Sequence, residues 1–317
     1  MPEVDTPQLS IIIVSYNTRD LTLACLESLY AHPPSVPFEV ILLDNASSDG
    51  SFAAIAAAFP QITAIDHHPN VGFAAGNNIA IERAGGRRIL LLNPDTVVRE
   101  GTFENLWSFA EREPTRGIWG GRTLFPGDGL NPSSCWRRMT LWSLACSALG
   151  LTHAFPRSRL FNSEAYGDWQ RDQVRDVDIV TGCFLLIDTS LWHRLDGFVR
   201  TFFMYAEEAD LCLRARALGA RPAITPDAQL IHYGGSSEVT GTEKVVKTVR
   251  GRVTLMRKHW SMPAYALGRG LLLCWALSRF LASRWMTGRQ DEASTAHDKW
   301  RAIWKRRGEW LAGYSQA

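Results

Sequence analysis

Residues 88–96 constrain the fold more strongly than any other stretch of the sequence. Arg88 is followed by the aliphatic run ILLL, which ends abruptly in Asn93-Pro94-Asp95. Such a run, bounded by a turn signal, is typical of a buried strand in a parallel sheet, and Pro94 cannot extend that strand. Asp95 is then expected at the carboxyl end of a central strand, where open α/β sheets bind ligands. A carboxylate there could ligate a divalent cation, although Asp95 taken alone is explained more simply as a turn residue.

Strand and helix signals alternate on the amino-terminal side of this stretch. Aliphatic and β-branched runs predict strands, and the segments between them carry helical patterns. This order is typical of a mainly parallel sheet with flanking helices, so the expected fold class is α/β and Rossmann-like. After Asp95 the pattern loosens, with a helix expected over residues 102–112. The expected strands are residues 9–15, 38–43, 62–66, 88–92, 118–125, 177–187 and 223–232.

Changes in pattern divide the chain into an expected domain of residues 1–240 and an extension of residues 241–317. Residues 126–176 lack a steady period and mix aliphatic, tryptophan and arginine residues. They are expected as an insertion in the first domain, either a lid that faces an acceptor or a membrane, or a buried helical insertion. The extension is basic and rich in tryptophan, and it is expected to form amphipathic helices.

Composition narrows the classes of protein to which the chain can belong. Apolar residues make up 46% of the 317 residues, enough for a large core, and the net charge of +2 is too small to indicate a nucleic-acid partner. The six cysteines show no zinc spacing. Cys25, Cys183, Cys212 and Cys274 lie within apolar patterns and are expected as reduced core residues, which suits a cytoplasmic protein. Residues 1–10 are polar and acidic, so no signal peptide is expected.

Four polar groups follow the proposed strands. They are Asp44, Asp95, the acidic cluster around Glu207 and Glu208, and His232. Asp95 and His232 could share a cation with diphosphate oxygens, and Asp44 could accept a hydrogen bond from a base or ribose. Glu207 or Glu208 is placed to be a general base. Each residue also has a structural explanation as a turn cap, a helix-dipole partner or a core histidine, but all four together favour a site.

Other catalytic signatures are missing from the sequence. There is no GxxxxGK[ST] or GxGxxG phosphate loop, no GxSxG elbow and no HExxH metalloprotease motif. A nucleotidyltransferase would need a glycine-rich triphosphate loop with a basic residue near the amino terminus, which SIIIVSYN does not supply. A non-catalytic scaffold that binds a nucleotide or lipid is the third hypothesis, and the acidic residues together with His232 argue against it.

Seven segments of the chain carry a family resemblance. They are SIIIVSYN (10–17), LLDNASSDGS (42–51), NVGFAAGNN (70–78), LLNPDT (91–96), TGCFLLI (181–187), FFMYAEEADLCLR (202–214) and IHYGGSS (231–237). Together they span about residues 9–240. In this combination the chain resembles a family 2 glycosyltransferase of the GT-A fold, in the rhamnosyltransferase-like branch. The resemblance implies transfer of a sugar from a nucleoside diphosphate with inversion at the anomeric carbon.

The resemblance also implies roles for particular residues. The family's DXD metal motif corresponds to Asn93-Pro94-Asp95, so Asp95 and His232 would hold Mg²⁺ or Mn²⁺. The family's Glu-Asp pair corresponds to Glu207-Glu208, where Glu208 matches the catalytic base with one extra methylene. The residues that match its nucleotide and donor positions are Ser15, Tyr16, Asn17, Asp44, Asn70, Gly72, Asn77, Asn93, Thr181 and Gly182.

The donor implied is dTDP-rhamnose, with UDP-galactofuranose or UDP-glucose as alternatives, and the acceptor a polysaccharide or polyprenyl-linked glycan. Residues 243–260 form a basic pattern with an apolar stripe, and residues 264–286 are more apolar. This composition is typical of helices on an anionic membrane surface, here the inner face of the cell membrane. The alternative is an amphipathic helix that packs on the catalytic domain or forms a homodimer. No nucleic-acid partner is expected, because the aromatic residues follow an apolar helical pattern.

Overall fold

A computed structural model of the chain describes residues 6–234, 241–284 and 290–315. The chain divides into two compact units. The first comprises Met1–Trp136, Gln170–Phe203 and Glu207–Ser237, and the second Arg137–Trp169, Met204–Ala206 and Glu238–Ala317. The segment 126–176, expected as one insertion, is therefore shared between the units, and most of it lies with the carboxyl-terminal helices.

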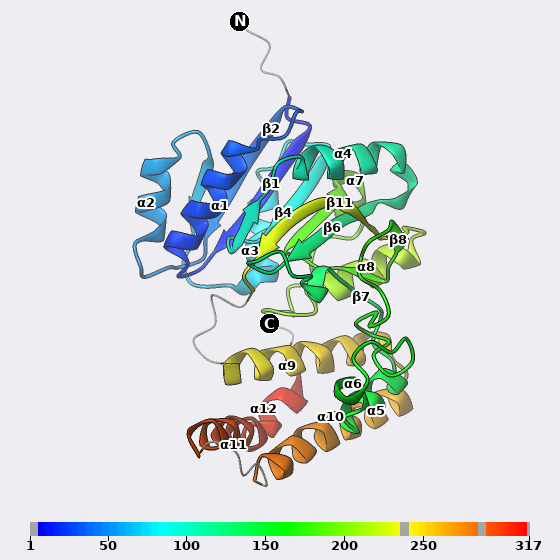
Figure 1. Cartoon of the computed structure of the whole chain (residues 1–317). Helices are drawn as coiled ribbons and strands as arrows, with labels where there is room; N and C mark the ends of the chain where they lie inside the picture. The colour runs from blue at the N-terminus through cyan, green and yellow to red at the C-terminus, as the bar shows by residue number, and fades with distance from the viewer. Residues whose placement is uncertain (1–5, 235–240, 285–289, 316–317) are drawn as a thin grey trace, which may run out of the picture. The chain divides into compact units, whose positions relative to one another are not determined.

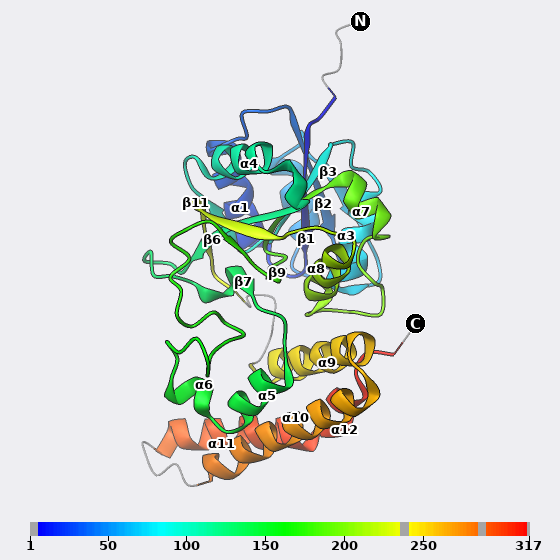
Figure 2. The same cartoon turned by 90° about the vertical axis from the view of Figure 1, so that its right-hand side faces the viewer.

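The first unit is built on a mixed sheet (Figure 1). Four parallel strands form one half, and β10 then enters antiparallel between β4 and β6. The strand order is β3 (Thr63–Asp66), β2 (Phe38–Asp44), β1 (Leu9–Ser15), β4 (Arg88–Leu92), β10 (Phe184–Asp188), β6 (Ile118–Leu124), β11 (Ala223–His232) and β5 (Thr96–Val98), with β8 (Arg175–Asp176) paired to β11. A separate two-stranded sheet joins β7 (Cys135–Trp136) and β9 (Ile179–Val180) (Figure 2).

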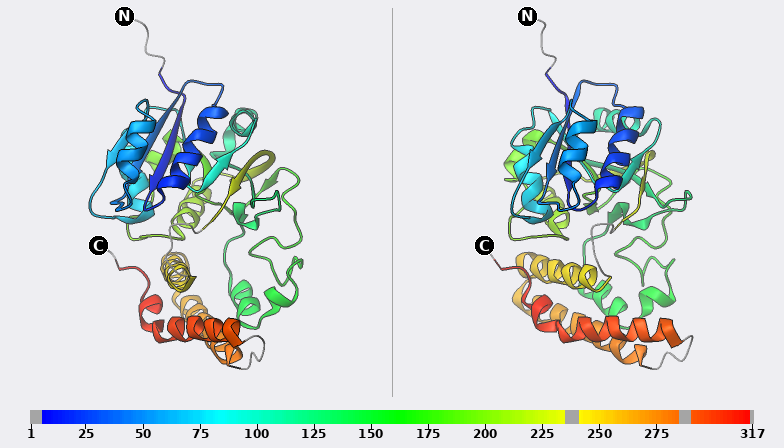
Figure 3. Two further views of the ribbon diagram at one scale, coloured as in Figure 1. Left: turned by 60° about the vertical axis from the view of Figure 1, so that its left-hand side comes forward. Right: turned by 90° about the vertical axis from the view of Figure 1, so that its left-hand side faces the viewer.

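Helices cover both faces of the parallel half of the sheet. Every residue of β1 is buried. Because successive strand residues point to opposite faces, Ile11 and Ile13 join the core with Leu26 of α1, whereas Val14 lies against Gly76 of α3. Figure 3 shows α1 and α2 side by side over the amino-terminal strands. The helices of this unit are α1 (Arg19–Ala31), α2 (Ser51–Ala58), α3 (Gly72–Ile81), α4 (Thr102–Arg112), α7 (Thr189–Arg194) and α8 (Glu207–Ala217).

The single strand expected over residues 177–187 is wrong. The chain turns at Thr181-Gly182, where the Phe184 N–H donates to the Thr181 carbonyl, so β9 and β10 are separate strands. β10 runs antiparallel to β4, with Phe184 beside Leu92. Thr181 and Gly182 therefore precede β10 at the same sheet edge that receives the residues after β4. The Asn93 N–H donates to the Cys183 carbonyl at 3.1 Å and fixes this meeting point.

The second unit is helical (Figure 2). The apolar stripe predicted from the sequence lies on α9, where Val246, Val249, Val253 and Met256 are buried. This helix packs against α10, α11 and α12. Within the described residues, no helix is long and apolar enough to cross a membrane. The helices are α5 (Leu141–Ala148), α6 (Leu151–Ala154), α9 (Gly241–His259), α10 (Met262–Ser283), α11 (Gln290–Lys305) and α12 (Arg307–Ala312).

Candidate active site

One edge of the sheet collects the predicted site residues of the first unit. The carboxyl ends of β1, β2, β4 and β11 point to this edge because these strands run in one direction. The amino end of β10 points there too, because that strand is reversed. Ser15, Asp44, Asn93, Thr181 and His232 thus stand at or beside the same edge, although they come from five parts of the sequence.

The loops after β1 and β2 are joined around Asp44. Asn17 adopts a left-handed backbone with φ 51°, and its N–H donates to Ser47 Oγ at 2.9 Å. Its side-chain oxygen accepts the Ser48 N–H at 2.7 Å. Asp44 is buried, and its Oδ1 accepts the Ser47 N–H at 2.8 Å. The other oxygen, Oδ2, is buried with no hydrogen-bond partner among the described residues, so it can accept a hydrogen bond from a ligand.

The neighbouring residues of the β1 loop have different surroundings. The Ser15 side chain is fully buried, and its hydroxyl lies 3.1 Å from that of Thr18 and 3.0 Å from that of Thr22. Tyr16 is half-buried beside it. The Ser15 hydroxyl therefore stabilises the start of α1. A contact between this loop and a nucleotide-sugar donor would come from Tyr16 or from the backbone.

Three predicted donor-binding residues shape the loop that opens α3. Asn70 Oδ1 accepts the Gly72 N–H at 2.9 Å, and Asn77 Nδ2 donates to the Phe73 carbonyl at 2.8 Å. Gly72 has φ +82°, and a Cβ built there would lie only 2.2 Å from the Phe203 carbonyl oxygen. Only glycine fits this approach. The contacts that these three residues make in the structure therefore hold the loop in shape. Contact between them and a nucleotide-sugar donor stays a prediction.

Asn45 is a site-forming residue that the sequence reasoning missed. It is buried, its Oδ1 accepts the Val71 N–H at 2.9 Å, and its Nδ2 donates to the Gly72 carbonyl at 3.1 Å. Asn45 thus ties the loop before α3 to the end of β2. Two signals were available in the sequence: its position directly after Asp44 at a strand end, and its place in the segment LLDNASSDGS.

Asp95 and His232 meet at this edge as expected. His232 Nε2 lies 3.3 Å from Asp95 Oδ1 and 3.4 Å from Asn93 Nδ2, while Asp95 Oδ2 accepts the Gly234 N–H at 3.0 Å. Burial lowers the pKa of His232, but the Cys183 and Asp95 side chains outweigh burial and raise it to about 10. Burial raises the pKa of Asp95, but His232 and the Gly234 amide outweigh burial and hold it below its usual value. At neutral pH the two side chains therefore form a charged pair.

The ligand atoms around Asp95 and His232 could supply part of the coordination of a hard cation. The amide oxygen of Asn93 and Nδ1 of His232 are buried with no hydrogen-bond partner in the described ranges. No group of three or more His, Cys, Asp and Glu side chains converges there among the residues that the structure describes. One carboxylate, one imidazole and one amide oxygen fit a Mg²⁺ or Mn²⁺ ion only if ligand oxygens complete its coordination.

The acidic pair opens α8 beside the turn at Thr181-Gly182. A Cβ built on Gly182 would lie 3.7 Å from the Cβ of Glu208, so these two positions are in contact distance. Glu208 is half-buried, whereas Glu207 is buried and its Oε2 has no hydrogen-bond partner in the described part of the chain. Asp210 is fully buried and accepts a hydrogen bond from Arg214 Nε at 2.7 Å, which is a structural role within the helix.

Burial distinguishes the two acids of the pair. Burial, and then the charge of Glu208, raises the pKa of Glu207 well above its usual value. A carboxyl group that stays protonated cannot take a proton from a hydroxyl. The half-buried Glu208 is therefore the better base of the two, as the resemblance implied.

Comparison with known proteins identifies the family. The sequence matches the family described as glycosyl transferase family 2 over residues 10–191, more than half of the chain. The chain therefore belongs to family 2 of the glycosyltransferases, and the resemblance read from its motifs is confirmed.

Three curated relatives are similar over most of the chain. It is 27% identical over 242 residues to the O-antigen biosynthesis protein RfbC of Myxococcus xanthus. The aligned region covers 74% of this chain but only 18% of RfbC. The chain is 25% identical over 250 residues to the N-acetylglucosaminyl-diphospho-decaprenol L-rhamnosyltransferase of Mycobacterium tuberculosis, with 73% and 78% covered. The rhamnosyltransferase WbbL of Escherichia coli is 27% identical over 235 residues, with 70% and 82% covered.

A solved structure shares the fold. The mannosyltransferase PcManGT of Pyrobaculum calidifontis, in complex with GDP-Man and Mn²⁺, superposes with a TM-score of 0.57 over 96% of this chain and 83% of its own. The two sequences are 18% identical, so this likeness concerns the fold alone. It confirms the expected GT-A arrangement of a central sheet with flanking helices.

Glu207→Gln should stabilise the protein at neutral pH. A raised folded-state pKa means that the native protein holds a proton that the unfolded chain releases, so stability falls as the pH rises above the unfolded pKa of Glu. Glutamine removes this loss. We expect thermal unfolding at pH 7.5 to shift upward by roughly 2–4 °C, and the two proteins to converge near pH 4. An unchanged or lower melting temperature at pH 7.5 would show that Glu207 is ionised in the folded protein.

Proposed function

We propose that the protein is a metal-dependent, inverting glycosyltransferase that moves rhamnose from dTDP-rhamnose to a polyprenyl-linked or polysaccharide glycan during cell-envelope polysaccharide synthesis. The names of the relatives support this choice of sugar and pathway. The observation that carries the proposal is the meeting, at one sheet edge, of an unpaired Asp44 oxygen, the Asp95–His232 pair and Glu208 beside Gly182.

Each residue has a distinct part in the proposed reaction. Asp44 accepts a hydrogen bond from the base or ribose of the donor, and the turn at Thr181-Gly182 lies beside the sugar. Glu208 takes the proton of the acceptor hydroxyl as that oxygen attacks the anomeric carbon from the face opposite the leaving group, so a single displacement inverts the centre. The Asp95 carboxylate and the Asn93 amide oxygen, joined by His232 once it has lost its proton, would hold a Mg²⁺ or Mn²⁺ ion, which would neutralise charge on the leaving diphosphate.

Asp95→Asn should abolish metal-dependent donor binding, because it removes the one carboxylate of the cation site while keeping the shape and the hydrogen bond from Gly234. Titration calorimetry with dTDP, with and without Mn²⁺, measures the effect. We expect the affinity gained from Mn²⁺ in the wild-type protein to be lost. A variant of Asp128, an exposed acid that pairs with Arg99, is the matched control. If Asp95→Asn binds dTDP with the same dependence on Mn²⁺, the proposed cation site is wrong.

Glu208→Gln should slow transfer by roughly a hundredfold or more at nearly unchanged donor affinity, because glutamine keeps the shape but cannot take a proton. Glu207→Gln should leave turnover within about threefold, since burial already favours the protonated form of Glu207. Steady-state transfer from dTDP-rhamnose to a soluble acceptor analogue measures both. The reverse pattern would assign the base to Glu207, and two fully active variants would exclude a catalytic role for this pair.

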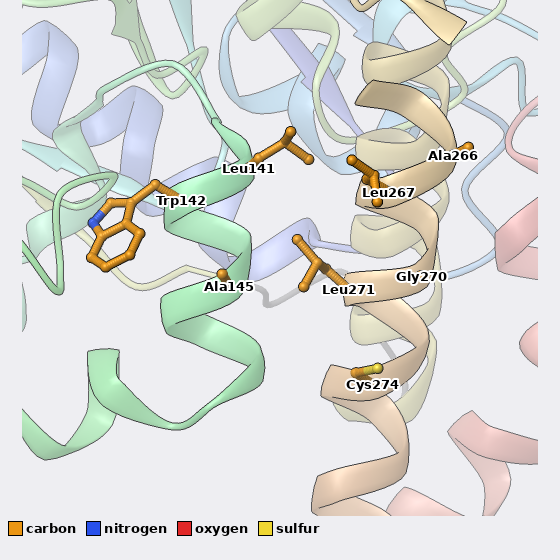
Figure 4. A pocket seen from close by; sticks show the side chains of 8 residues that line it. All are labelled: Leu141, Trp142, Ala145, Ala266, Leu267, Gly270, Leu271 and Cys274. Atoms are coloured by element: carbon orange, nitrogen blue, oxygen red, sulfur yellow. The ribbon is translucent and has the colours of Figure 1, made fainter. Parts of the chain in front are cut away.

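We further propose that the second unit binds an anionic membrane surface through a face formed by α5 and α10. Between these helices lies a hollow of about 540 Å³, and Leu141, Leu267 and Leu271 point into the space between them (Figure 4). Its lining is Leu141, Trp142, Ala145, Ala266, Leu267, Gly270, Leu271 and Cys274. Cys274, expected in the core, is in fact exposed here, whereas Cys25, Cys183 and Cys212 are buried as expected.

Exposure and charge both favour a lipid surface. Met262, Leu267 and Leu281 of α10 are 72%, 62% and 44% exposed, and Trp142 of α5 is 48% exposed. From Lys244 to Gln290 the sequence contains ten Lys and Arg residues and no Asp or Glu. A segment that combines exposed apolar side chains with basic residues and no acidic residue is typical of proteins that lie on anionic membranes. In this proposal the protein is cytoplasmic and peripheral on the inner face of the cell membrane.

Leu267→Glu should reduce co-sedimentation with vesicles of phosphatidylglycerol and phosphatidylcholine by roughly tenfold, because it replaces an apolar contact with a charge of the same sign as the lipid. Leu218→Glu is the matched control, because Leu218 is also exposed, at 48%, but belongs to the first unit. Light scattering of both variants tests the alternative. A wild-type dimer that Leu267→Glu dissociates, without vesicle binding by the wild type, would make this face a homodimer interface.

A further inference from the structure

The backbone directly before the acidic pair is strained. Tyr205 and Ala206 have φ values of 70° and 74°, in the left-handed region that residues with a side chain rarely adopt. Two such residues in succession persist only where the surrounding structure determines their conformation. The next residue is Glu207, the first of α8, so this segment sets where the helix with Glu207 and Glu208 begins.

Gly251 and Tyr314 both contact this segment, and both belong, like Met204–Ala206, to the second unit. Gly251 of α9 lies against its backbone, so that a Cβ built there would be 2.4 Å from the Tyr205 carbonyl oxygen. No residue larger than glycine fits without moving that carbonyl. The Tyr314 hydroxyl donates a hydrogen bond to the Met204 carbonyl at 2.9 Å.

Tyr314 is itself firmly placed. Its side chain is buried, and its N–H donates to Thr254 Oγ1 at 2.7 Å. The Arg250 guanidinium lies over its ring, 4.6 Å from the centroid, and also donates to the Gly313 carbonyl at 3.0 Å. Gly251, Thr254 and Arg250 all belong to α9, so a single helix supports both contacts to residues 204–206.

We propose that Gly251 and Tyr314 are positioning residues for the base of the transfer reaction. They hold residues 204–206 in the left-handed conformation, and this conformation directs the Glu208 carboxylate toward the turn at Thr181-Gly182. The inference rests on the proposed role of Glu208 as the base. It gives the carboxyl-terminal helices a part in catalysis that is separate from membrane binding.

The test compares Tyr314→Phe and Gly251→Ala with matched controls in the second unit. Tyr265→Phe removes a tyrosine hydroxyl from α10, and Gly308→Ala adds a methyl group on α12 where nothing lies within 4 Å. Loss of one hydrogen bond that orients the segment should lower kcat about three- to tenfold in Tyr314→Phe. Gly251→Ala should lower it by roughly a hundredfold, the donor KM should stay within twofold, and both controls should match the wild type.

A double-mutant cycle separates positioning from general stability. In the Glu208→Gln background, Tyr314→Phe should cause no further loss of kcat, because the group that it positions can no longer accept a proton. Additive losses, or equal losses in the controls, would overturn the proposal, and so would a Tyr314→Phe variant with wild-type kcat. If Glu208→Gln alone keeps full activity, the base assignment fails, whatever Tyr314→Phe does.

Discussion

The antiparallel entry of β10 between β4 and β6 decides which residues can meet at the active edge. In an all-parallel sheet the segment before this strand would lie at the opposite edge from Asp44 and Asp95. Because β10 is reversed, its amino end carries Thr181 and Gly182 to the carboxyl end of β4, and the bond from Asn93 to Cys183 fixes that meeting. The glycine then leaves room for the start of α8, with Glu208 at contact distance. This one reversal thus brings the turn at Thr181-Gly182 and Glu208 to the sheet edge that carries Asp95.

Ion pairing and burial limit the negative charge of the carboxyl groups at this sheet edge. The pKa of Asp95 lies below its usual value beside His232, whose own pKa is raised, and burial raises the pKa of Glu207 next to Glu208. An opposite charge therefore sets the pKa of Asp95, whereas exclusion from water sets that of Glu207. The proposed binding of a diphosphate donor would benefit from this arrangement, because fewer negative charges would face the donor.

Much of this edge could be predicted from the sequence, for identifiable reasons. The strands β1, β2 and β4 each contain four consecutive aliphatic residues, and Pro94 marks where β4 must end, so the place of Asp95 followed directly. The direction of β10 could not be predicted, because the run FLLI is equally apolar in either orientation. The role of Asn45 was also hidden, because its partners are backbone groups of Val71 and Gly72 that come near only in the folded chain. The same holds for Tyr205 and Ala206, whose left-handed backbone depends on Gly251 and Tyr314, far along the sequence.

The three-residue segment Met204–Ala206 has a consequence for how this chain can be recombined. The second unit is assembled from three separate pieces of sequence, and the smallest of them lies immediately before the acidic pair. A chimera that exchanged only the residues after 240 would place foreign helices against a native loop shaped for Gly251 and Tyr314. Exchange between relatives would have to carry residues 137–169 and 204–206 together with the carboxyl-terminal helices. The two units are thus distinct as compact bodies, but they are not separable as modules along the gene.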